Sequence, residues 1–298
     1  MPAPSSGRPS RFSAPLAITV ASWGFNFVAL KVLYHQMTPQ AVSVVRYLPM
    51  WAILVGLCLW KRESLRYPRE DTFRLLALGA LSMGVYMVLF LEGMQRTSAA
   101  EGAIILATAP IFTALLAAAV KQERFRWSVL VGTLTAFVGV ALVVLGANGS
   151  IHGQLIGNTL ILASAVMWAG CAVLTRTLVG TMSPLRVLTL SMPGGLVVLV
   201  PYGFSAAIAV DWVDLSWASW AMLAHVTVLA GVVGFTGFYA GVRQIGSSGA
   251  MLYQFLVPPT AVFFAWLVLH DPIQWMQGAG LAVILGGVIY TTRARRGL

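Results

Sequence analysis

The sequence predicts an all-α integral membrane protein with ten transmembrane helices, arranged as two inverted five-helix repeats with both termini in the cytoplasm. Composition is the first reason: 58% of the 298 residues are hydrophobic and 9% are charged, whereas an ordinary soluble domain carries about 25% charged residues. The second reason is a series of ten long apolar runs. The third is that the first half of the chain recurs in the second half.

Each apolar run is close to the length that crosses a bilayer. A hydrocarbon core takes about 20 helical residues to cross, and backbone groups in lipid must hydrogen-bond within their own segment, so runs of this length must be helices. The ten runs are 13–33, 39–60, 72–94, 98–120, 127–146, 154–177, 185–209, 217–242, 248–269 and 274–292. The first run follows two arginines, as a signal peptide does, but it ends without a small-x-small cleavage site, so we expect a retained spanning helix.

The two halves of the chain match in two registers. A shift of 145 residues places Trp23 on Trp168, and a shift of 148 continues the match further along. The later pairs are Gly93 with Gly241, Pro110 with Pro258, Glu123 with Asp271, Trp127 with Trp275, Gly132 with Gly280 and Gly139 with Gly287. Their collinear order predicts a duplication. The expected units are a disordered N-terminal tail 1–12, a first repeat 13–146, a linker 147–153, a second repeat 154–292 and a basic C-terminal tail 293–298.

The nineteen Lys and Arg residues are distributed unevenly between the two sides of the membrane. With the N-terminus inside, sixteen fall in inner segments, Lys31 and Arg96 fall on the outer side, and Arg46 lies within a span. Because an excess of basic residues marks the cytoplasmic side, we expect both termini in the cytoplasm. The net charge of +10 therefore reflects topology, and the basic residues form no continuous patch for nucleic acid.

Five helices per repeat is an odd number, so the second repeat must enter the membrane upside down. Inverted repeats of this kind are the usual plan of secondary transporters, whose substrate site lies near the midplane where the two repeats face each other. Alternating access uses this symmetry, because the two halves can exchange conformations. An intramembrane enzyme or a structural subunit, which is another class of protein to consider, does not need inverted symmetry.

Two repeat-related tryptophans are the leading site candidates. Trp23 lies about ten residues into its run and Trp168 about 14 residues into its own, which puts both near the midplane. Asn26 shares the helical face of Trp23 with Phe27 beside it, and Cys171, the repeat mate of Asn26, shares the face of Trp168. Polar faces in lipid turn toward protein or water, so we predict that the indoles form opposite walls of a central cavity. The alternative is that these residues only pack.

Further candidates for the cavity lie in the third, eighth and ninth runs. They are Tyr86, Tyr239, Tyr253 and Gln254, whose buried hydroxyls and amide need partners. The eighth run also carries four closely spaced glycines, Gly231, Gly234, Gly237 and Gly241. Glycines at these spacings let helices approach closely, so we interpret them as packing residues.

The ionisable residues within the spans are few. Arg46, eight residues into the second run, is too deep to reach the interface easily and should have a partner. Glu101 is explained by a capping box that starts at Ser98, so we predict an ion pair between Arg46 and Glu92. The alternative is that Arg46 binds the substrate. His225 is a possible site of protonation, because histidine titrates near neutral pH.

The sequence does not indicate catalysis. It contains no nucleotide-binding loop, no HExxH and no GxSxG motif. Cys58 and Cys171 lie inside apolar runs with no Cys or His at ligand spacing. We therefore expect neither a disulfide, a metal nor a cofactor.

Several of these motifs resemble a known family. Trp23-Gly24-x-Asn26-Phe27 followed by Lys31 resembles the first-helix pattern of EamA-type transporters in the drug/metabolite transporter superfamily. The ends of both repeats are also similar to that family's, namely Glu123, Gly132 and Gly139, then Asp271, Gly280 and Gly287, with Asp271 in place of the more usual Glu. The aromatic central faces are similar to those of YddG-type aromatic amino acid exporters of bacteria. The resemblance covers nearly the whole chain and implies ten helices, a central cavity and export of aromatic or related amphipathic compounds. It also implies a multi-pass protein of the bacterial inner membrane.

The leading hypothesis is a secondary transporter that exports small amphipathic metabolites, above all aromatic or other amino acids, by alternating access. Aromatic faces can stack on rings and hold ammonium groups by cation–π contacts of about 0.5–2 kcal/mol each. The alternative is a flippase or a nucleotide-sugar or phosphometabolite carrier, which would favour several basic residues at the midplane where only Arg46 is available. Expected partners are a small-molecule substrate and the lipid bilayer, with no nucleic acid and no obligatory protein partner, so a monomer would suffice.

The uneven distribution of basic residues makes a topology prediction. Single cysteines placed at Ser64 or Gly180, in a background without Cys58 and Cys171, should react with an impermeant maleimide only after cells are opened. Cysteines at Gly149 or Ser216 should react in intact cells, because these loops are expected outside. If the cysteine at position 64 is labelled in intact cells and the one at position 149 is not, the orientation is the opposite of the predicted one.

Overall fold

The structure, a computed structural model, describes residues 13–94, 96, 105–146, 155–270 and 273–296, and every regular element in these ranges is a helix. The predicted all-α class is confirmed. Seven helical segments are long and apolar enough to cross a membrane: Pro39–Trp60, Thr72–Gly93, Leu155–Val179, Pro184–Ile208, Trp217–Ile245, Ser247–Val268 and Trp275–Ala294. Three shorter apolar segments are Ala14–Leu30, Ala109–Ala119 and Trp127–Val143. Each of the ten falls on one of the predicted runs.

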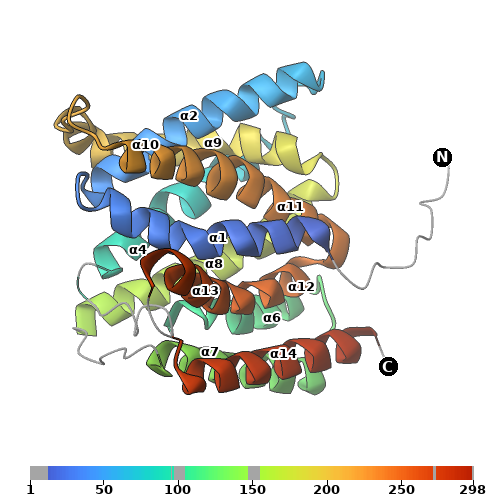
Figure 1. Cartoon of the computed structure of the whole chain (residues 1–298). Coiled ribbons are helices and arrows are strands. Elements are labelled where there is room, and N and C mark those ends of the chain that lie inside the picture. The colour runs from blue at the N-terminus through green and yellow to red at the C-terminus, as the bar shows by residue number, and fades with distance from the viewer. Residues whose placement is uncertain (1–12, 95, 97–104, 147–154, 271–272, 297–298) are drawn as a thin grey trace.

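The helices form one bundle (Figure 1). In the first half they are α1 (Ala14–Leu33), α2 (Pro39–Trp60), α3 (Thr72–Gly79), the π-helical η1 (Ala80–Val85), α4 (Tyr86–Met94), α6 (Ala109–Ala119) and α7 (Trp127–Gly146). In the second half they are α8 (Leu155–Val179), α9 (Pro184–Ile208), α10 (Trp217–Ala224), the π-helical η2 (His225–Val233), α11 (Gly234–Ile245), α12 (Ser247–Leu252), the 3-10 helix η3 (Tyr253–Leu256), α13 (Val257–Leu269) and α14 (Trp275–Arg296). The start of α1 and the end of α14 lie at the same end of the bundle (Figure 1), which we call the terminal end.

The centre of the bundle is formed by α1 and α8, which begin the two matched halves. Helix α1 packs against α11 and α13, and α8 packs against α4 and α6. The four partners are themselves related by the 148-residue shift. The two halves therefore make corresponding contacts around the same centre.

Helices α7 and α14 pack side by side at one edge of the bundle (Figure 1). A side chain on Gly132 would lie 3.0 Å from the carbonyl oxygen of Gly287, and one on Gly139 would lie 2.8 Å from that of Gly280. The repeat pairs Gly132 with Gly280 and Gly139 with Gly287, so each glycine contacts the mate of the other. Such reciprocal contacts between antiparallel helices are what a two-fold axis across them produces, and small residues let the backbones meet.

The π-helical turns also fall at related positions. A shift of 148 residues carries η1 onto residues 228–233, which lie within η2. Single π-helical turns are uncommon and often occur at functional sites. Both lie midway along spans that adjoin the centre of the bundle.

The C-terminal end of the chain continues the last helix. Helix α14 extends to Arg296, so residues 293–296 of the predicted basic tail 293–298 are helical. Arginine favours helix and its charge complements the C-terminal end of a helix dipole, which allows the helix to extend. The predicted tail 1–12, the linker 147–153 and the capping box at Glu101 lie outside the described residues.

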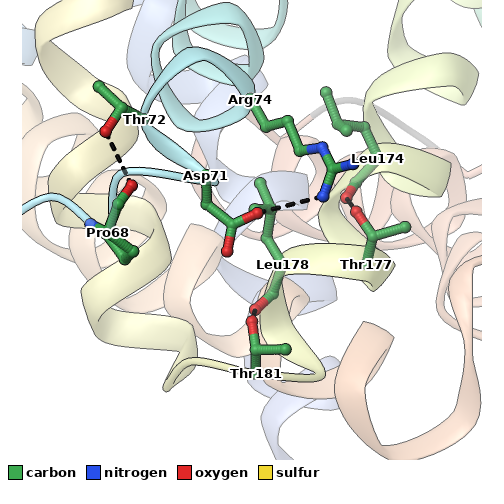
Figure 2. Close-up of polar contacts among 8 residues, drawn as sticks. All are labelled: Pro68, Asp71, Thr72, Arg74, Leu174, Thr177, Leu178 and Thr181. Carbon is green, nitrogen blue, oxygen red and sulfur yellow. Dashed lines mark hydrogen bonds and ion pairs between the residues drawn. The ribbon is translucent and has the colours of Figure 1, made fainter.

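Polar side chains at the start of α3 and the end of α8 mostly bond to their own backbone (Figure 2). Thr72 donates to the Pro68 carbonyl at 2.8 Å, and Thr177 donates to the Leu174 carbonyl at 2.7 Å. Arg74 pairs with Asp71 at 3.2 Å, three residues away along the chain. Hydroxyls satisfied in this way need no external partner, which distinguishes them from the polar groups at the centre of the bundle.

The α7–α14 contact predicts a contrast between two adjacent glycines. A side chain on Gly287 would lie 2.5 Å from the Ala136 backbone nitrogen, whereas Gly286 has open space. Replacing Gly287 by alanine should lower the free energy of unfolding by about 1–3 kcal/mol through overpacking. Gly286→Ala should be neutral or stabilising, because alanine favours helix. Thermal unfolding in detergent measures both, and equal melting temperatures would contradict the close contact.

Candidate functional site

A cavity of about 170 Å³ lies at the centre of the bundle. Its lining comes from α1, α2, α4, α6, α8, α11, η3, α13 and adjoining links, and comprises Trp23, Asn26, Leu30, Tyr34, Pro39, Val42, Ser43, Arg46, Tyr47, Tyr86, Met87, Phe90, Leu91, Leu106, Ala107, Pro110, Trp168, Phe235, Gln254, Phe255, Val257 and Pro258. From α1, the lining begins at Trp23 and continues toward the helix's C-terminal end. The cavity therefore extends from the middle of the bundle away from the terminal end.

Aromatic rings close the cavity at the middle of the bundle. The ring centroids of Trp23 and Trp168 are 6.1 Å apart in an edge-to-face arrangement. Phe238 contacts both, at 5.6 Å from Trp23 and 5.2 Å from Trp168, and Phe235 lies 5.3 Å from Trp23. Tyr86 adds a ring 5.2 Å from Trp168. The prediction of opposite walls is therefore wrong: the two indoles touch, and together with their neighbours they form a floor.

The indoles are held by hydrogen bonds as well as by ring contacts. The Trp23 Nε1–H donates to the Ala230 carbonyl of η2 at 2.9 Å, and the Trp168 Nε1–H donates to Gln254 Oε1 at 3.1 Å. A side chain on Gly234 would lie 2.5 Å from Trp23 Nε1. Glycine at this position thus makes room for the ring, which agrees with the predicted packing role of the eighth-run glycines.

Four polar residues of the lining each have a buried atom without a hydrogen-bond partner: Asn26 Oδ1, Arg46 Nε, the Tyr47 hydroxyl and Gln254 Nε2. The bond from Trp168 fixes the Gln254 oxygen as the acceptor, so its amide nitrogen is the free donor. A buried polar atom without a partner costs about 1–3 kcal/mol. Natural structures retain few such groups, and those retained call for an explanation such as a ligand.

The predicted ion pair between Arg46 and Glu92 is wrong. Glu92 instead pairs with Arg96 one helical turn away and accepts a hydrogen bond from the Tyr202 hydroxyl at 3.0 Å. Arg46 is 6% exposed, lines the cavity, and has its guanidinium carbon 4.9 Å from the centre of the Tyr47 ring. Because Glu92 pairs with the nearby Arg96, it is not available to Arg46 on α2. The positive charge of Arg46 therefore remains in the cavity wall.

One titrating group of the lining lies just beyond the end of α1. Burial raises the pKa of the Tyr34 phenol, and the charge of Arg46 offsets part of that rise. The Tyr34 hydroxyl therefore stays protonated at neutral pH and can donate a hydrogen bond.

The structure brings six of the twelve predicted site residues to the cavity: Trp23, Asn26, Tyr86, Trp168, Gln254 and Arg46. Tyr239 is 1% exposed beneath the floor, in contact with Phe238 and outside the lining. Cys171 lies on a different, apolar groove between helices. The hydroxyl of Tyr253 accepts the backbone N–H of Ser13 at 3.3 Å, toward the terminal end.

Two of the three remaining predicted residues, His225 and Glu92, lie outside the cavity lining. His225 Nε2 is 3.2 Å from the Ser22 carbonyl and its ring lies against Phe25, so it packs between helices outside the lining. Glu92, like His225, is not in the lining. The side chain of Phe27 lies outside the described residues.

Five aromatic residues of the cavity lining were not among the predicted site residues: Tyr34, Tyr47, Phe90, Phe235 and Phe255. Phe235 and Phe238 belong to the glycine-rich helix, where both contact the indoles. Gly234 and Gly241 face α1. Phe238 follows Gly234 by four residues and precedes Gly241 by three, so helical spacing places it on the same face. Tyr47, fully buried beside Arg46, could have been found because it is next to the deepest charge in the sequence.

Below the aromatic floor, the terminal end is closed by polar contacts. Arg176 Nη1 lies 3.0 Å from Glu123 Oε1, and both abut the turn at Gly246, whose φ of +83° favours glycine. The Gln122 side chain donates to the Val173 carbonyl at 3.1 Å. Arg176, which ends its predicted span, thus ties α8 to the segment that follows α6.

The described residues contain no group of three or more His, Cys, Asp and Glu side chains that could hold a metal ion. The chemical resources of the cavity are thus aromatic faces, one guanidinium, and amide and hydroxyl groups. Groups of this kind are those that bind and orient small molecules in protein pockets.

An all-helical bundle with apolar spans and a central polar-aromatic cavity defines a multi-pass membrane transporter. The sequence profile of the EamA-like transporter family matches residues 14–145 and again residues 155–293. The chain belongs to the EamA-like transporter family, part of the drug/metabolite transporter superfamily. The family resemblance drawn from the sequence motifs is confirmed, and a transporter rather than an enzyme is indicated.

Similar proteins include two that are named for amino acids. A probable terminal-alkyne amino-acid exporter of Streptantibioticus cattleyicolor is 29% identical over 95% of this chain and 93% of its own length. A probable amino-acid metabolite efflux pump of Salmonella typhimurium is 25% identical over 97% of each chain. A solved crystal structure has a TM-score of 0.81 at 14% identity, covering 95% of this chain and 98% of the other. At that identity it supports the fold.

The polar stripe on α1 predicts opposite effects for two of its members. Thr19 donates to the carbonyls of Pro15 and Gly234, both at 2.9 Å, whereas Asn26 Oδ1 has no partner. Thr19→Val should therefore cost about 0.5–1.5 kcal/mol of stability. Asn26→Leu should be neutral or stabilising, because it removes an unsatisfied group. Melting temperatures without substrate test this contrast, and an equal loss in both variants would make Asn26 a structural residue.

Proposed function

We propose that this protein exports small amphipathic metabolites, above all aromatic or other amino acids, by alternating access across the bacterial inner membrane. The observation that carries the proposal is the combination of an aromatic floor with four unpartnered polar atoms in the lining of the same cavity. An amino acid has complementary chemistry: a carboxylate for donors, an ammonium for an acceptor, and an apolar or aromatic side chain for ring contacts.

The role of each residue follows from its charge and hydrogen-bonding capacity. Arg46 and the Gln254 Nε2 group donate to the substrate carboxylate. Asn26 Oδ1 accepts from the ammonium group, which also lies favourably over the faces of Trp23 and Trp168. Tyr86 and Phe90, whose rings stack at 6.0 Å, extend the apolar wall for the side chain.

Alternating access is supported by the relations between the halves. The reciprocal glycine contacts of α7 and α14, the related π-helical turns, and the corresponding partners of α1 and α8 fit ten spans arranged as two inverted repeats, 13–146 and 154–292. With the basic residues inside, the terminal end is cytoplasmic. The cavity then extends toward the outer side, and the aromatic floor and the Arg176–Glu123 pair close the inner side.

The alternative, a flippase or a nucleotide-sugar or phosphometabolite carrier, has less support. Phosphate groups are usually held by several basic side chains. Arg46 is the one Lys or Arg among the cavity-lining residues that the structure describes. A single guanidinium suits one carboxylate better than a di- or triphosphate. The names of the amino-acid exporters among the relatives point in the same direction.

The proposal predicts that Arg46 discriminates by the substrate's carboxylate. Purified protein in liposomes should exchange radiolabelled phenylalanine. Phenethylamine, which lacks the carboxylate, should compete poorly with this exchange. Arg46→Met should lower the apparent affinity for phenylalanine by about 10- to 150-fold, the equivalent of one charge-assisted hydrogen bond. The apparent affinity for phenethylamine should change little.

Arg74→Gln is the matched control, because Arg74 is exposed and pairs with Asp71 far from the cavity. It should transport phenylalanine as the wild type does. If Arg46→Met lowers the apparent affinities for phenylalanine and phenethylamine equally, Arg46 does not bind the substrate carboxylate. Failure to exchange any amino acid by a folded wild-type protein would refute the amino-acid proposal.

A further inference from the structure

A second pocket, of about 430 Å³, lies at the terminal end of the bundle, on the far side of the aromatic floor from the substrate cavity. It is bounded by the end of α6, the link to α7, the first turn of α7, the end of α8, and the turn between α11 and α12. Its lining comprises Ala114, Leu115, Glu123, Arg124, Phe125, Arg126, Val129, Leu130, Arg176, Arg243, Gln244, Ile245, Gly246 and Ser248. Transport of the substrate gives it no role.

The charge of this pocket is strongly positive. Four arginines and one glutamate line it. Arg176 pairs with that glutamate, Glu123, and Arg126 donates to the Ala294 carbonyl at 2.7 Å. Arg124 and Arg243 are exposed, and with four arginines against one carboxylate the positive charge remains in excess. An anion would complete the pocket.

A buried hydroxyl supports a ligand at the same place. Ser248 is 4% exposed, lines the pocket, and its Oγ has no hydrogen-bond partner. The Thr177 hydroxyl, by contrast, is satisfied by a carbonyl of its own helix. A phosphate oxygen offers the acceptor that the Ser248 hydroxyl lacks.

The other side of the pocket is apolar. Leu115 of α6 is 42% exposed and faces the pocket with Ala114, and Val129 and Leu130 of α7 line it from the neighbouring helix. These residues belong to apolar helices that lead from the basic rim into the hydrocarbon region. A free phosphate makes no favourable contact with such a wall, whereas a phospholipid presents a charged head and an acyl chain together.

We propose that this pocket binds an anionic phospholipid of the cytoplasmic leaflet, with its phosphate at Arg124, Arg243 and Ser248 and an acyl chain along α6 and α7. Basic pockets between spans on the cytoplasmic side suit anionic headgroups. Arg176 belongs to both the pocket and the pair with Glu123. The bound lipid thus lies against the contact that closes the inner side.

The test uses the full-length protein purified in neutral detergent and native mass spectrometry to count retained lipids. Phosphatidylglycerol should bind at about tenfold lower concentration than phosphatidylcholine. Arg124→Gln with Arg243→Gln should abolish this preference, and Ser248→Ala should reduce it. Arg124→Lys with Arg243→Lys should retain most of it, which separates loss of charge from a folding defect.

The matched control is Arg66→Gln with Arg69→Gln, two exposed arginines of the link between α2 and α3. This variant should keep the preference, and an equal loss here would show a general charge effect and overturn the proposal. Unchanged preference in the Arg124 and Arg243 glutamine variant would also overturn it. Inorganic phosphate and glycerol 3-phosphate at millimolar concentration should not displace the lipid. If they stabilise the protein as phosphatidylglycerol does, the occupant is a free anion and not a lipid.

Discussion

The edge-to-face contact between Trp23 and Trp168 is the interaction around which this structure is built. It joins the first helices of the two halves, α1 and α8, and it is completed by Phe235 and Phe238 of α11. Large rings can meet at the centre of a bundle only where the backbone leaves room. Gly234 provides that room for Trp23. The floor of the cavity depends on this packing.

The scaffold is nearly symmetric, but the chemistry at its centre is not. Asn26 corresponds to Cys171 in the other half, Arg46 to Ser191, and Gln254 to Leu106. In each pair, only one residue brings a strong polar group to the cavity. Likewise Trp23 lies against Gly234, whereas its mate Trp168 lies against Tyr86, the residue that corresponds to Gly234. The repeat thus shapes the scaffold, while the departures from the repeat place the polar groups of the cavity unevenly between the two halves.

The features that depend on regular spacing could be predicted from the sequence. Apolar length indicated the helices, and the matched registers led to Trp23, Trp168 and the glycines of α7 and α14, because these positions are constrained by close packing. Residues whose role depends on which partner is nearest were predicted less well. Glu92 pairs with Arg96, which is four residues further along the chain and just past the end of α4, and Arg46 is left in the cavity wall. Tyr239 and Cys171 share helical faces with the lining residues Phe235 and Trp168, but each lies one turn nearer the terminal end, so both fall below the floor and outside the cavity.

The central claim is that the indoles form the substrate-facing floor, and apparent affinity in purified, folded variants tests it most directly. Trp23→Ala and Trp168→Ala should each weaken substrate binding about two- to thirty-fold, the equivalent of about 0.5–2 kcal/mol of lost ring contact, and the phenylalanine variants should lose less. Stability must be measured alongside, because the two rings also pack against each other. Unchanged affinity in both alanine variants, beside an intact wild type, would contradict the account and leave the tryptophans as packing residues alone.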